Sequence, residues 1–417
     1  MRILFLSNFF PPARPGGYTQ WCHEVAERLA KQGHTIGVLT SRYELAKAPA
    51  NEQNIYRLLH LEGDLAYYQP LHFFTRWKKQ RQENLAFLEH TIQDFSPDLI
   101  FVWGMWALSK ALPALAEQLL PGRVVYYISD YWLSALDMHT AYWQSSTRSS
   151  IMQAPKRVLS RFAMSMLAEE VQPTLKLEQV ICVSARVRGL LVEAGLRVQH
   201  ARIIHGGTDM ERFPSVHKRD YSGHLKLLYA GQLVRHKGVH TAIEAMARLV
   251  NQRGINQISL AIVGSGHPDY EAFLHNLVAK ERLSDYVTFH APVSKDQMPA
   301  VFQEYDVLVF PSIYEEPLAR VTQEAMASGL VVVGTTTGGT EEILKEGETG
   351  LTFVPEAADG LAEQISRLIA DPDLCCHLAQ AGRQTVLENF TLDKMAQQIE
   401  DYLLSCLVRN SSNRLNA

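Results

Sequence analysis

The sequence predicts an α/β protein with two doubly wound, Rossmann-like domains that face a central cleft. Three observations lead to this prediction. The N-terminus has the pattern strand, glycine loop, helix and strand, with strands at residues 2–7 and 36–40 and Gly16-Gly17 in the loop. Short apolar strands then alternate with helical patterns along both halves of the chain. A polar segment, residues 212–223, separates the two series and is the expected linker.

The strands follow one another at short intervals in both halves. After the first βαβ unit, the N-terminal half is expected to form strands at 99–103, 124–128, 179–183 and 203–204. The second series is expected at 225–230, 259–263, 287–289, 307–310 and 331–333, with a helix at 239–251 after its first strand. We therefore place an N-terminal domain at 1–205, a C-terminal domain at 206–391, a terminal helix at 392–408 and a tail at 409–417.

The composition is that of a globular protein without a nucleic-acid or secretory signature. The chain has 417 residues, of which 47% are apolar, and a formal net charge of −4, so no overall basic field favours nucleic acid. Its cysteines are odd in number and lack C-x-x-C spacing, which argues against a disulfide framework or a zinc site. The most apolar stretch, residues 99–108, is much shorter than a membrane-crossing helix. We expect a cytoplasmic protein.

Ligands of open parallel sheets bind beyond the carboxyl ends of the strands, so the loops there carry the candidate site residues. The clearest candidates follow the strand at 307–310. Glu316 lies in this loop, Pro317 favours the first turn of a helix, and Glu324 is placed about two turns further, where it can accept hydrogen bonds from ribose hydroxyls. The alternative is that both glutamates are solvated residues favoured by the helix dipole. The backbone amides expected to bind a diphosphate are those of Leu318, Ala319 and Arg320.

Residues 310–346 resemble the donor-site signature of the retaining family 4 glycosyltransferases, which have the GT-B fold. The resemblance implies that Glu316 contacts the hydroxyls of the transferred sugar, that Glu324 binds the ribose, and that the three amides receive the diphosphate. Leu318-Ala319 stands where the family often has Phe-Gly, and alanine still exposes an amide. The matching features are Glu316, Glu324, the alanine-rich Ala325-Met326-Ala327, Gly329, the strand 331–333, Gly338-Gly339 and Glu342.

A second loop, residues 231–238, carries a cation. It resembles the family's Gly-Arg-Leu…Lys-Gly loop, in which Lys237 matches the lysine. A cation after a strand neutralises a departing diphosphate without a metal, and the histidines show no metal-ligand spacing. The resemblance implies an NDP-sugar co-substrate and no cofactor or metal besides it, and these observations agree. Gln232 takes the place of the family arginine, and Arg235 is either its substitute or a solvated loop residue.

Three weaker matches place further donor residues. The glycine loop after the first strand resembles the family's N-terminal loop, so Gly16 and Gly17 are expected to approach the donor phosphates and the acceptor. Gly264 belongs to a Gly-x-Gly loop that follows the strand at 259–263. Pro292 lies in the segment that forms the wall for the nucleotide base in the family.

Asp130 follows a predicted strand and matches a family aspartate that contacts donor or acceptor; the alternative is a turn carboxylate. Ser129 replaces the family histidine, and a serine cannot take over an imidazole's protonation role. Glu316, Lys237 and Asp130 are the predicted catalytic residues of a hexosyl or related glycosyl transfer. Two rivals are a GT-B sugar-nucleotide epimerase or hydrolase and, because of Ser129 and Gln232, a catalytically inactive nucleotide-sugar-binding protein.

The N-terminal half carries aromatic residues interleaved with Lys and Arg, at 72–81 and again at 142–162. Aromatic anchors beside basic residues suit an anionic membrane surface, and an ordinary solvated helix face has the same composition. GT-B enzymes bind the acceptor in this half. The pattern favours a peripheral enzyme of the inner membrane face with a glycan or lipid-linked acceptor, in cell-surface polysaccharide or glycolipid synthesis. The family resemblance implies that the sugar is transferred with retention. The resemblance also implies that the terminal helix packs back on the N-terminal domain.

Overall fold

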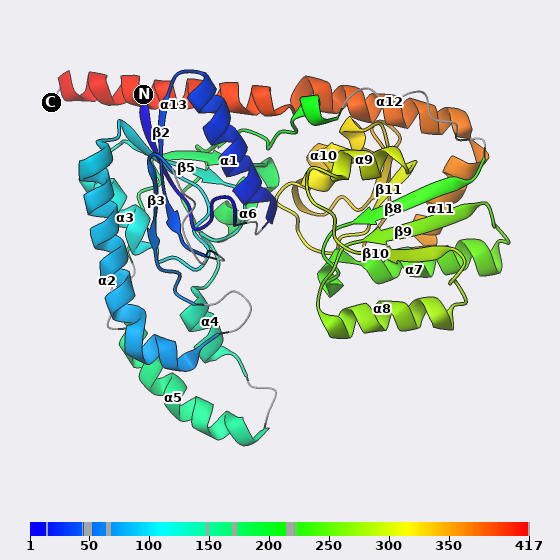
Figure 1. The fold of residues 1–417 in the computed structure, drawn as a ribbon, viewed down its shortest axis with the longest axis horizontal. Coiled ribbons are helices and arrows are strands. Elements are labelled where there is room, and N and C mark those ends of the chain that lie inside the picture. The colour runs from blue at the N-terminus through cyan, green and yellow to red at the C-terminus, as the bar shows by residue number, and fades with distance from the viewer. Residues whose placement is uncertain are drawn as a thin grey trace. The chain divides into compact units, whose positions relative to one another are not determined.

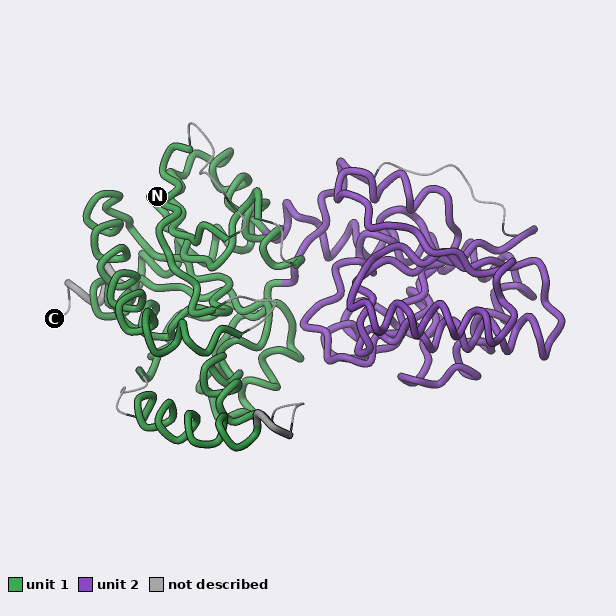
Figure 2. The backbone as a smooth tube through the Cα atoms, turned by 60° about the horizontal axis from the view of Figure 1, so that its bottom comes forward, with its two compact units in different colours: residues 1–204, 396–417 green, residues 205–395 purple. Residues whose placement is uncertain are grey.

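The chain divides into two compact units, residues 1–204 with 396–417 and residues 205–395 (Figure 2). Each unit is built around one parallel sheet with helices packed against it (Figure 1). The structure is a computed structural model of the 417-residue chain. It describes all residues except 14–15, 44, 46–51, 64–67, 147–149, 169–172, 214–220, 222 and 416–417.

The sheet of the first unit has the strand order β3-β2-β1-β4-β5-β6-β7 with parallel neighbours. Its central strands are apolar runs buried on both faces, as a helix-covered parallel sheet requires. The winding reverses between β1 and β4, the point at which such sheets bind ligands. The elements are β1 (Arg2–Leu6), α1 (Gly16–Lys31), β2 (Thr35–Ser41), β3 (Ile55–Leu59), α2 (Pro70–Phe95), β4 (Leu99–Val102), α3 (Ala111–Leu119), β5 (Val124–Ile128), α4 (Met138–Gln144), α5 (Ser150–Ala168), β6 (Gln179–Cys182), α6 (Ala185–Glu193) and β7 (Arg202–Ile203).

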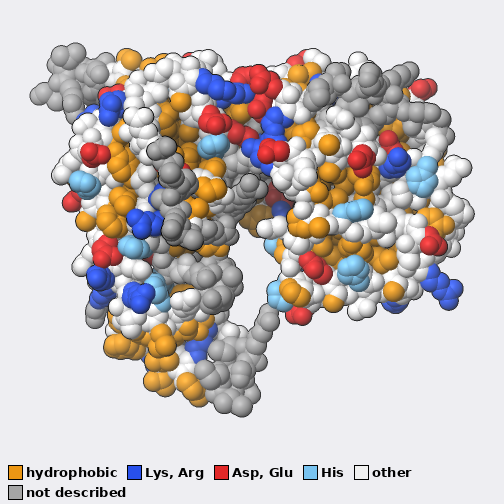
Figure 3. All heavy atoms as spheres, in the orientation of Figure 1, with side chains coloured by type: hydrophobic (Ala, Val, Ile, Leu, Met, Phe, Trp, Pro, Cys, Tyr) orange, Lys and Arg blue, Asp and Glu red, His pale blue; other side chains and the backbone are white. Residues whose placement is uncertain are grey.

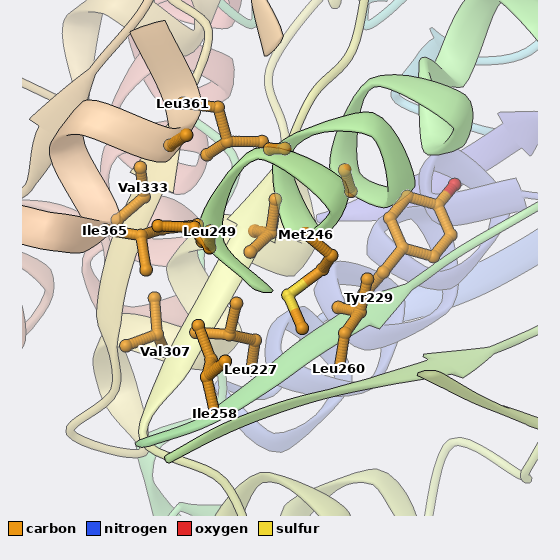
Figure 4. Close-up of a cluster of buried hydrophobic side chains, with 14 of the residues drawn as sticks. Leu227, Tyr229, Met246, Leu249, Ile258, Leu260, Val307, Val333, Leu361 and Ile365 are labelled. Carbon is orange, nitrogen blue, oxygen red and sulfur yellow. The ribbon is translucent and has the colours of Figure 1, made fainter. Parts of the chain in front are cut away.

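The second unit repeats this design with the strand order β10-β9-β8-β11-β12-β13, again with parallel neighbours. Its core joins the sheet to the helices α7 and α11, as the packing of Leu227, Met246 and Ile365 shows (Figure 4). The elements are β8 (Leu225–Ala230), α7 (Val239–Ala247), β9 (Ile258–Val263), α8 (Pro268–Lys280), β10 (Val287–His290), α9 (Met298–Gln303), β11 (Val307–Phe310), α10 (Arg320–Ala327), β12 (Val331–Gly334), β13 (Leu351–Thr352), α11 (Ala358–Ala370) and α12 (Pro372–Asn389).

The last helix, α13 (Leu392–Leu415), begins in the second unit and continues in the first. Within the first unit, Glu400 Oε1 lies 2.7 Å from His34 Nε2, and Tyr402 Oη donates to the backbone carbonyl of Val180 at 3.4 Å. The end of the chain is therefore part of the first unit. The linker expected at 212–223 falls largely outside the described residues.

Every strand predicted from the sequence is present, with ends that agree or differ by one residue. The strands β3 and β13 were not predicted, because β3 is interrupted by Arg57 and β13 has only two residues. The helix predicted at 239–251 is α7 followed by a π-helical turn over Arg248–Gln252. The sheet framework is thus the part of the fold that apolar patterning predicts well.

Candidate functional site

Two loops of the second unit are bound to each other at the carboxyl ends of the neighbouring strands β8 and β11. The amide of Ile313 donates to the carbonyl of His236 at 2.9 Å. Gly238 has a φ of +69°, and a Cβ on it would lie 1.9 Å from the carbonyl oxygen of Pro311, so only glycine fits here. These contacts hold Lys237 against the loop that follows β11.

A nearly buried ion pair joins the two loops. Lys237 Nζ donates to Glu316 Oε1, and Ser312 Oγ donates to the same oxygen at 2.7 Å. The Glu316 side chain is 10% exposed and the Lys237 side chain 24%. A carboxylate this deeply buried needs a cation or several donors as partners. The arrangement places one positive and one negative group where a ligand with both an anionic group and hydroxyls could bind.

The glycine pair Gly338-Gly339 fixes the backbone of Glu316. Gly339 donates its amide to the carbonyl of Glu316 at 2.7 Å. Gly338 has a φ of +64°, and a Cβ on it would lie 2.1 Å from the same carbonyl oxygen. Thr335 adds a hydrogen bond from its Oγ1 to the carbonyl of Ser312 at 2.6 Å. The Gly-Gly turn therefore acts by supporting the loop that carries the glutamate.

The helix α10 begins at Arg320, so the prediction that Pro317 lies in its first turn was wrong. A helix starting at Pro317 would need the carbonyl of Glu316 for its first intrahelical bond, and the Gly339 amide already occupies that carbonyl. Ala319 is instead the N-cap, with an extended backbone and no side-chain cap. Leu318 thus precedes the helix, and the amides at its start are those from Ala319 onwards.

Arg320 contributes its guanidinium as well as its place at the helix start. Its Nε donates to Glu324 Oε1 at 2.8 Å, and both side chains are largely buried. Glu324 borders a cavity of about 330 Å³ between the ends of β8, β9 and α10. Gly264, with a φ of +153°, brings two of these loops together, since a Cβ on it would lie 1.9 Å from the carbonyl oxygen of Gly231. The cavity is lined by Ala230, Gly231, Gln232, Val263, Gly264, Ser265, Pro292, Val293, Met298, Val321 and Glu324.

In the first unit, polar side chains gather at the carboxyl ends of β1 and β5. Asp130 is buried, and its Oδ1 accepts the backbone N–H of Trp132 at 2.9 Å. Burial raises the pKa of Asp130 to about 6, while the Trp132 amide and the Trp106 side chain act in the opposite direction. Asn8 Nδ2 donates to the carbonyl of Trp106 at 2.9 Å and to Tyr18 Oη at 3.2 Å. Burial, and then the charge of Asp130, raise the pKa of Tyr18.

A larger cavity, of about 630 Å³, lies in the same unit among α2, α4 and the loops after β4 and β5. Three of its lining residues carry buried ring nitrogens with no hydrogen-bond partner among the described residues: Trp77 Nε1, Trp132 Nε1 and His139 Nε2. The nearest carboxylate oxygen to His139 Nε2, from Glu62, is 3.9 Å away, which is too long for a hydrogen bond. Burial lowers the pKa of His139 to about 4. Buried nitrogens without partners indicate a place where a ligand or water binds.

Comparison with known proteins assigns the family. Residues 15–212 match the family model described as Glycosyltransferase Family 4, and residues 215–385 match the one described as Glycosyl transferases group 1. The chain belongs to these glycosyltransferases. The two matches divide between the two units that the structure shows.

The glycosyltransferase is similar to known relatives over nearly its whole length. It is 27% identical over 410 residues to the glycogen synthase of Mycobacterium tuberculosis, covering 95% of this chain and 92% of that protein. It is 25% identical over 419 residues to the GDP-mannose-dependent alpha-(1-6)-phosphatidylinositol monomannoside mannosyltransferase of that organism, covering 96% and 98%. The solved structure of Anabaena HepE in complex with UDP-glucose matches with a TM-score of 0.66 and 21% identity, over 97% of this chain and 100% of that one. The fold is therefore GT-B, as predicted.

In this glycosyltransferase, several of the predicted donor residues meet at two places in the second unit. Lys237 contacts Glu316, and Glu324 shares its cavity with Gly264 and Pro292. Gln232, at the position of the family arginine, also lines this cavity, whereas the exposed Arg235 is not among its lining residues.

The remaining predicted residues lie in the first unit or were placed differently. Gly16 and Gly17 were predicted in a loop but are the first residues of α1, and Gly16 has a φ of +81°. Asp130 lies at the carboxyl end of β5, in the polar cluster with Tyr18 and Asn8. These three residues therefore lie in the first unit, and their roles in the site stay predictions.

Sequence reasoning missed several residues that shape the site. Ser312 was not singled out, although it follows β11 directly and lies four residues before Glu316. The Arg320 guanidinium was missed because only its amide was considered. The cavity of the first unit was missed because Trp77, Trp132 and His139 come from three separate segments.

Proposed function

We propose that this glycosyltransferase moves a sugar from an NDP-sugar to an acceptor hydroxyl with retention of the anomeric configuration. The observation that carries the proposal is the pair of Lys237 and Glu316, which packed loops hold at the carboxyl ends of β8 and β11. The loop after β8 also lines the cavity that Glu324 borders. Catalysis of this transfer requires a cation near the departing diphosphate and acceptors near the sugar hydroxyls. The second unit supplies both from rigid loops.

Lys237 is the cation that stabilises the diphosphate as the bond to the sugar breaks. The uncapped start of α10 adds backbone N–H donors and the positive end of the helix dipole. Glu316 accepts hydrogen bonds from the sugar hydroxyls, and Glu324 from the ribose. Because Lys237 supplies the positive charge, the transfer needs no metal ion.

Two similarities support a nucleotide-sugar donor. The HepE structure is a complex with UDP-glucose, and the mannosyltransferase of Mycobacterium tuberculosis is named for its dependence on GDP-mannose. The same mannosyltransferase is named for a phosphatidylinositol acceptor. We infer from this that the protein acts in the synthesis of a cell-surface polysaccharide or glycolipid.

The larger cavity of the first unit is the proposed acceptor site. Its size suits one or two sugar rings, and the three ring nitrogens without partners offer donors to hydroxyl or phosphate oxygens. Asp130, buried close to this cavity with a pKa of about 6, is the proposed group of the first unit that takes part in proton exchange near the reacting hydroxyl. Gly16 and Gly17, the first residues of α1, are the proposed contacts of the first unit with the donor phosphates.

The cell location follows from the proposed acceptor. No helix in the described part of the chain is both long and apolar enough to cross a membrane. We place the enzyme in the cytoplasm, bound peripherally at the inner face of the membrane, where a lipid-linked acceptor is available.

A screen of UDP-, GDP- and ADP-sugars tests the donor site. A specific donor should raise the melting temperature by mass action, and Glu324→Ala should abolish this shift. Glu363→Ala is the matched control, because its side chain is exposed in the same unit and only forms a surface pair with Arg253. The proposal fails if no nucleotide sugar shifts the transition, or if both variants behave alike.

Product analysis tests the transfer itself. Incubation of the donor with lipid extracts and glycan acceptors should yield a product whose new linkage has the donor's anomeric configuration by NMR. Turnover of the donor without an acceptor would instead indicate a hydrolase or epimerase. Donor binding without any turnover would indicate a binding protein.

A further inference from the structure

The helix α5 has two apolar faces. Ala163 and Leu167 are buried in an aromatic cluster with α2 and α4. On another side of the helix, Val158 is 70% exposed and Phe162 62% exposed, with Leu159 also exposed. Residues i, i+1 and i+4 share one side of a helix, so these three side chains form an apolar stripe that faces solvent.

The first turn of α2 extends this stripe. The ring of Phe74 stacks on that of Phe162, with centroids 5.9 Å apart. Leu71, one turn before Phe74, is 80% exposed. Figure 3 shows apolar side chains gathered at the bottom of the view, over α5 and the start of α2. We call Leu71, Val158, Leu159 and Phe162 the docking face.

The docking face is surrounded by positive charge. No Asp or Glu occurs in residues 70–82 or 138–168, although the whole chain has a net charge of −4. Helical geometry at about 100° per residue places Arg157 and Arg161 along one border of the stripe and Lys156 along the other. The basic residues of these two segments that the structure describes are Arg76, Lys78, Lys79, Arg81, Lys156, Arg157 and Arg161.

We propose that the docking face binds the surface of a bilayer containing anionic lipids. The apolar stripe enters the boundary between headgroups and acyl chains, and the flanking Lys and Arg side chains contact lipid phosphates. A second copy of this chain fits less well, because a symmetric contact would bring two predominantly basic surfaces together. The proposal rests on the proposed function, which gives a reason for binding a membrane, but membrane binding itself does not require catalysis.

The docking face and the proposed acceptor cavity share their helices. Trp77 and Arg81 of α2 and Leu167 of α5 line the cavity, while Leu71 and Phe162 of the same helices belong to the docking face. Binding of α5 to a bilayer therefore brings the cavity close to the lipid headgroups. This assigns a membrane-borne amphiphile as the class of acceptor.

Vesicle flotation of the full chain tests the docking face. Vesicles of phosphatidylcholine with phosphatidylglycerol should bind the protein at low salt, and high salt or pure phosphatidylcholine should weaken the binding. Arg157→Glu with Arg161→Glu should lower the partition coefficient on the anionic vesicles roughly a hundredfold or more. Val158→Ser with Phe162→Ser should lower it by about tenfold or more.

Matched controls come from exposed positions in the second unit. Val354 is exposed to the same degree as Val158, and Lys226 and Lys280 are exposed cations. Val354→Ser and the pair Lys226→Glu with Lys280→Glu should leave vesicle binding unchanged, and circular dichroism should show that all variants are folded. Donor-induced thermal shifts should persist in the docking variants, which separates loss of docking from failure of the donor site.

Two kinds of outcome, in vesicle binding and in oligomeric state, overturn the proposal. One is no binding to anionic vesicles at low salt, or equal binding by the docking variants and the unaltered protein. The other is a dimer in solution that Phe162→Ser dissociates while vesicles are not bound, since a second copy would then cover the face.

Discussion

The two units share one kind of sheet but treat the polar groups at its carboxyl end differently. In the second unit, Lys237 and Glu316 neutralise each other, and glycine contacts fix the loops that carry them. In the first unit, Asp130 Oδ2 and Trp132 Nε1 are buried with no hydrogen-bond partner of good geometry in the described part of the chain. The proposed donor side thus pairs its two charged groups within the protein, whereas the proposed acceptor side keeps a carboxylate oxygen and ring nitrogens that a ligand would satisfy.

The largest effect on activity is expected when a charge of the Lys237–Glu316 pair in the second unit is removed. Glu316→Gln and Lys237→Gln should each lower kcat by roughly 100- to 1000-fold, because each removes a charge aimed at the reacting groups. Steady-state kinetics with the preferred donor would measure this. Glu363→Gln, at an exposed surface pair, should retain full activity. Equal rates for Glu316→Gln and this control would contradict the assignment of the pair.

A substitution at one glycine of the second unit should strongly reduce the stability of the protein. Gly238→Ala should destabilise the protein by about 2–4 kcal/mol, because its Cβ meets the Pro311 carbonyl at a positive φ. Gly254 has nearly the same φ, +68°, with no atom within 4 Å of a built Cβ. Gly254→Ala should therefore cost only about 1 kcal/mol. Urea unfolding measures the free energy of unfolding of both variants. The difference between them gives the cost of the steric contact, separate from the cost of the positive φ.

In the first unit, the buried carboxyl should respond to pH. The pKa of Asp130 is raised by burial to about 6, so folding is disfavoured where this carboxyl ionises. The penalty is absent at pH values below the unfolded pKa, grows as the pH rises through the range between the two pKa values, and is complete above about 6. Asp130→Asn should therefore stabilise the protein by about 2–3 kcal/mol at pH 7.5 but hardly at pH 4.

Thermal unfolding of Asp130→Asn and of the unaltered protein between pH 4 and pH 7.5 would measure the difference in their stability at each pH. A constant difference at all pH values would show that Asp130 does not titrate there. A loss of transfer activity in the stabilised variant would place the carboxyl among the reacting groups.

A smaller effect is expected at the ring nitrogens of the proposed acceptor cavity. Trp132→Phe should raise KM for the acceptor by roughly 3- to 10-fold, as expected for one lost neutral hydrogen bond. Trp103 is the control, because its Nε1 is also buried without a partner among the described residues, yet it does not line the cavity. Trp103→Phe should leave KM unchanged. Similar KM values for both variants would remove Trp132 from the acceptor site.

The smallest expected effect is that of a chelator. In the proposed mechanism Lys237 supplies the positive charge beside the diphosphate, so EDTA should leave the transfer rate unchanged within error. A loss of activity in EDTA that Mg²⁺ or Mn²⁺ restores would contradict this and would show that the leaving group is also neutralised by a metal ion.

Local patterns in the sequence determined the sheet framework and much of the donor site. Apolar runs of strand length predicted β1, β5, β8 and β11, because a buried parallel strand needs apolar residues on both faces. The order of Glu316, Glu324 and the glycine turn predicted the family. These signals lie within short stretches of chain, so no long-range contact is needed to recognise them.

Only the tertiary structure decided where α10 begins and where the larger cavity lies. The start of α10 depends on the Gly339 amide, which occupies the Glu316 carbonyl from a distant position in the chain. The cavity depends on Trp77, Trp132 and His139, which belong to separate segments. The exposed stripe on α5 likewise depends on tertiary packing, because Ala163 and Leu167 bury a different side of the helix. Local patterning reports the preference of a segment, whereas hydrogen-bond competition and packing between distant segments decide which preference is satisfied.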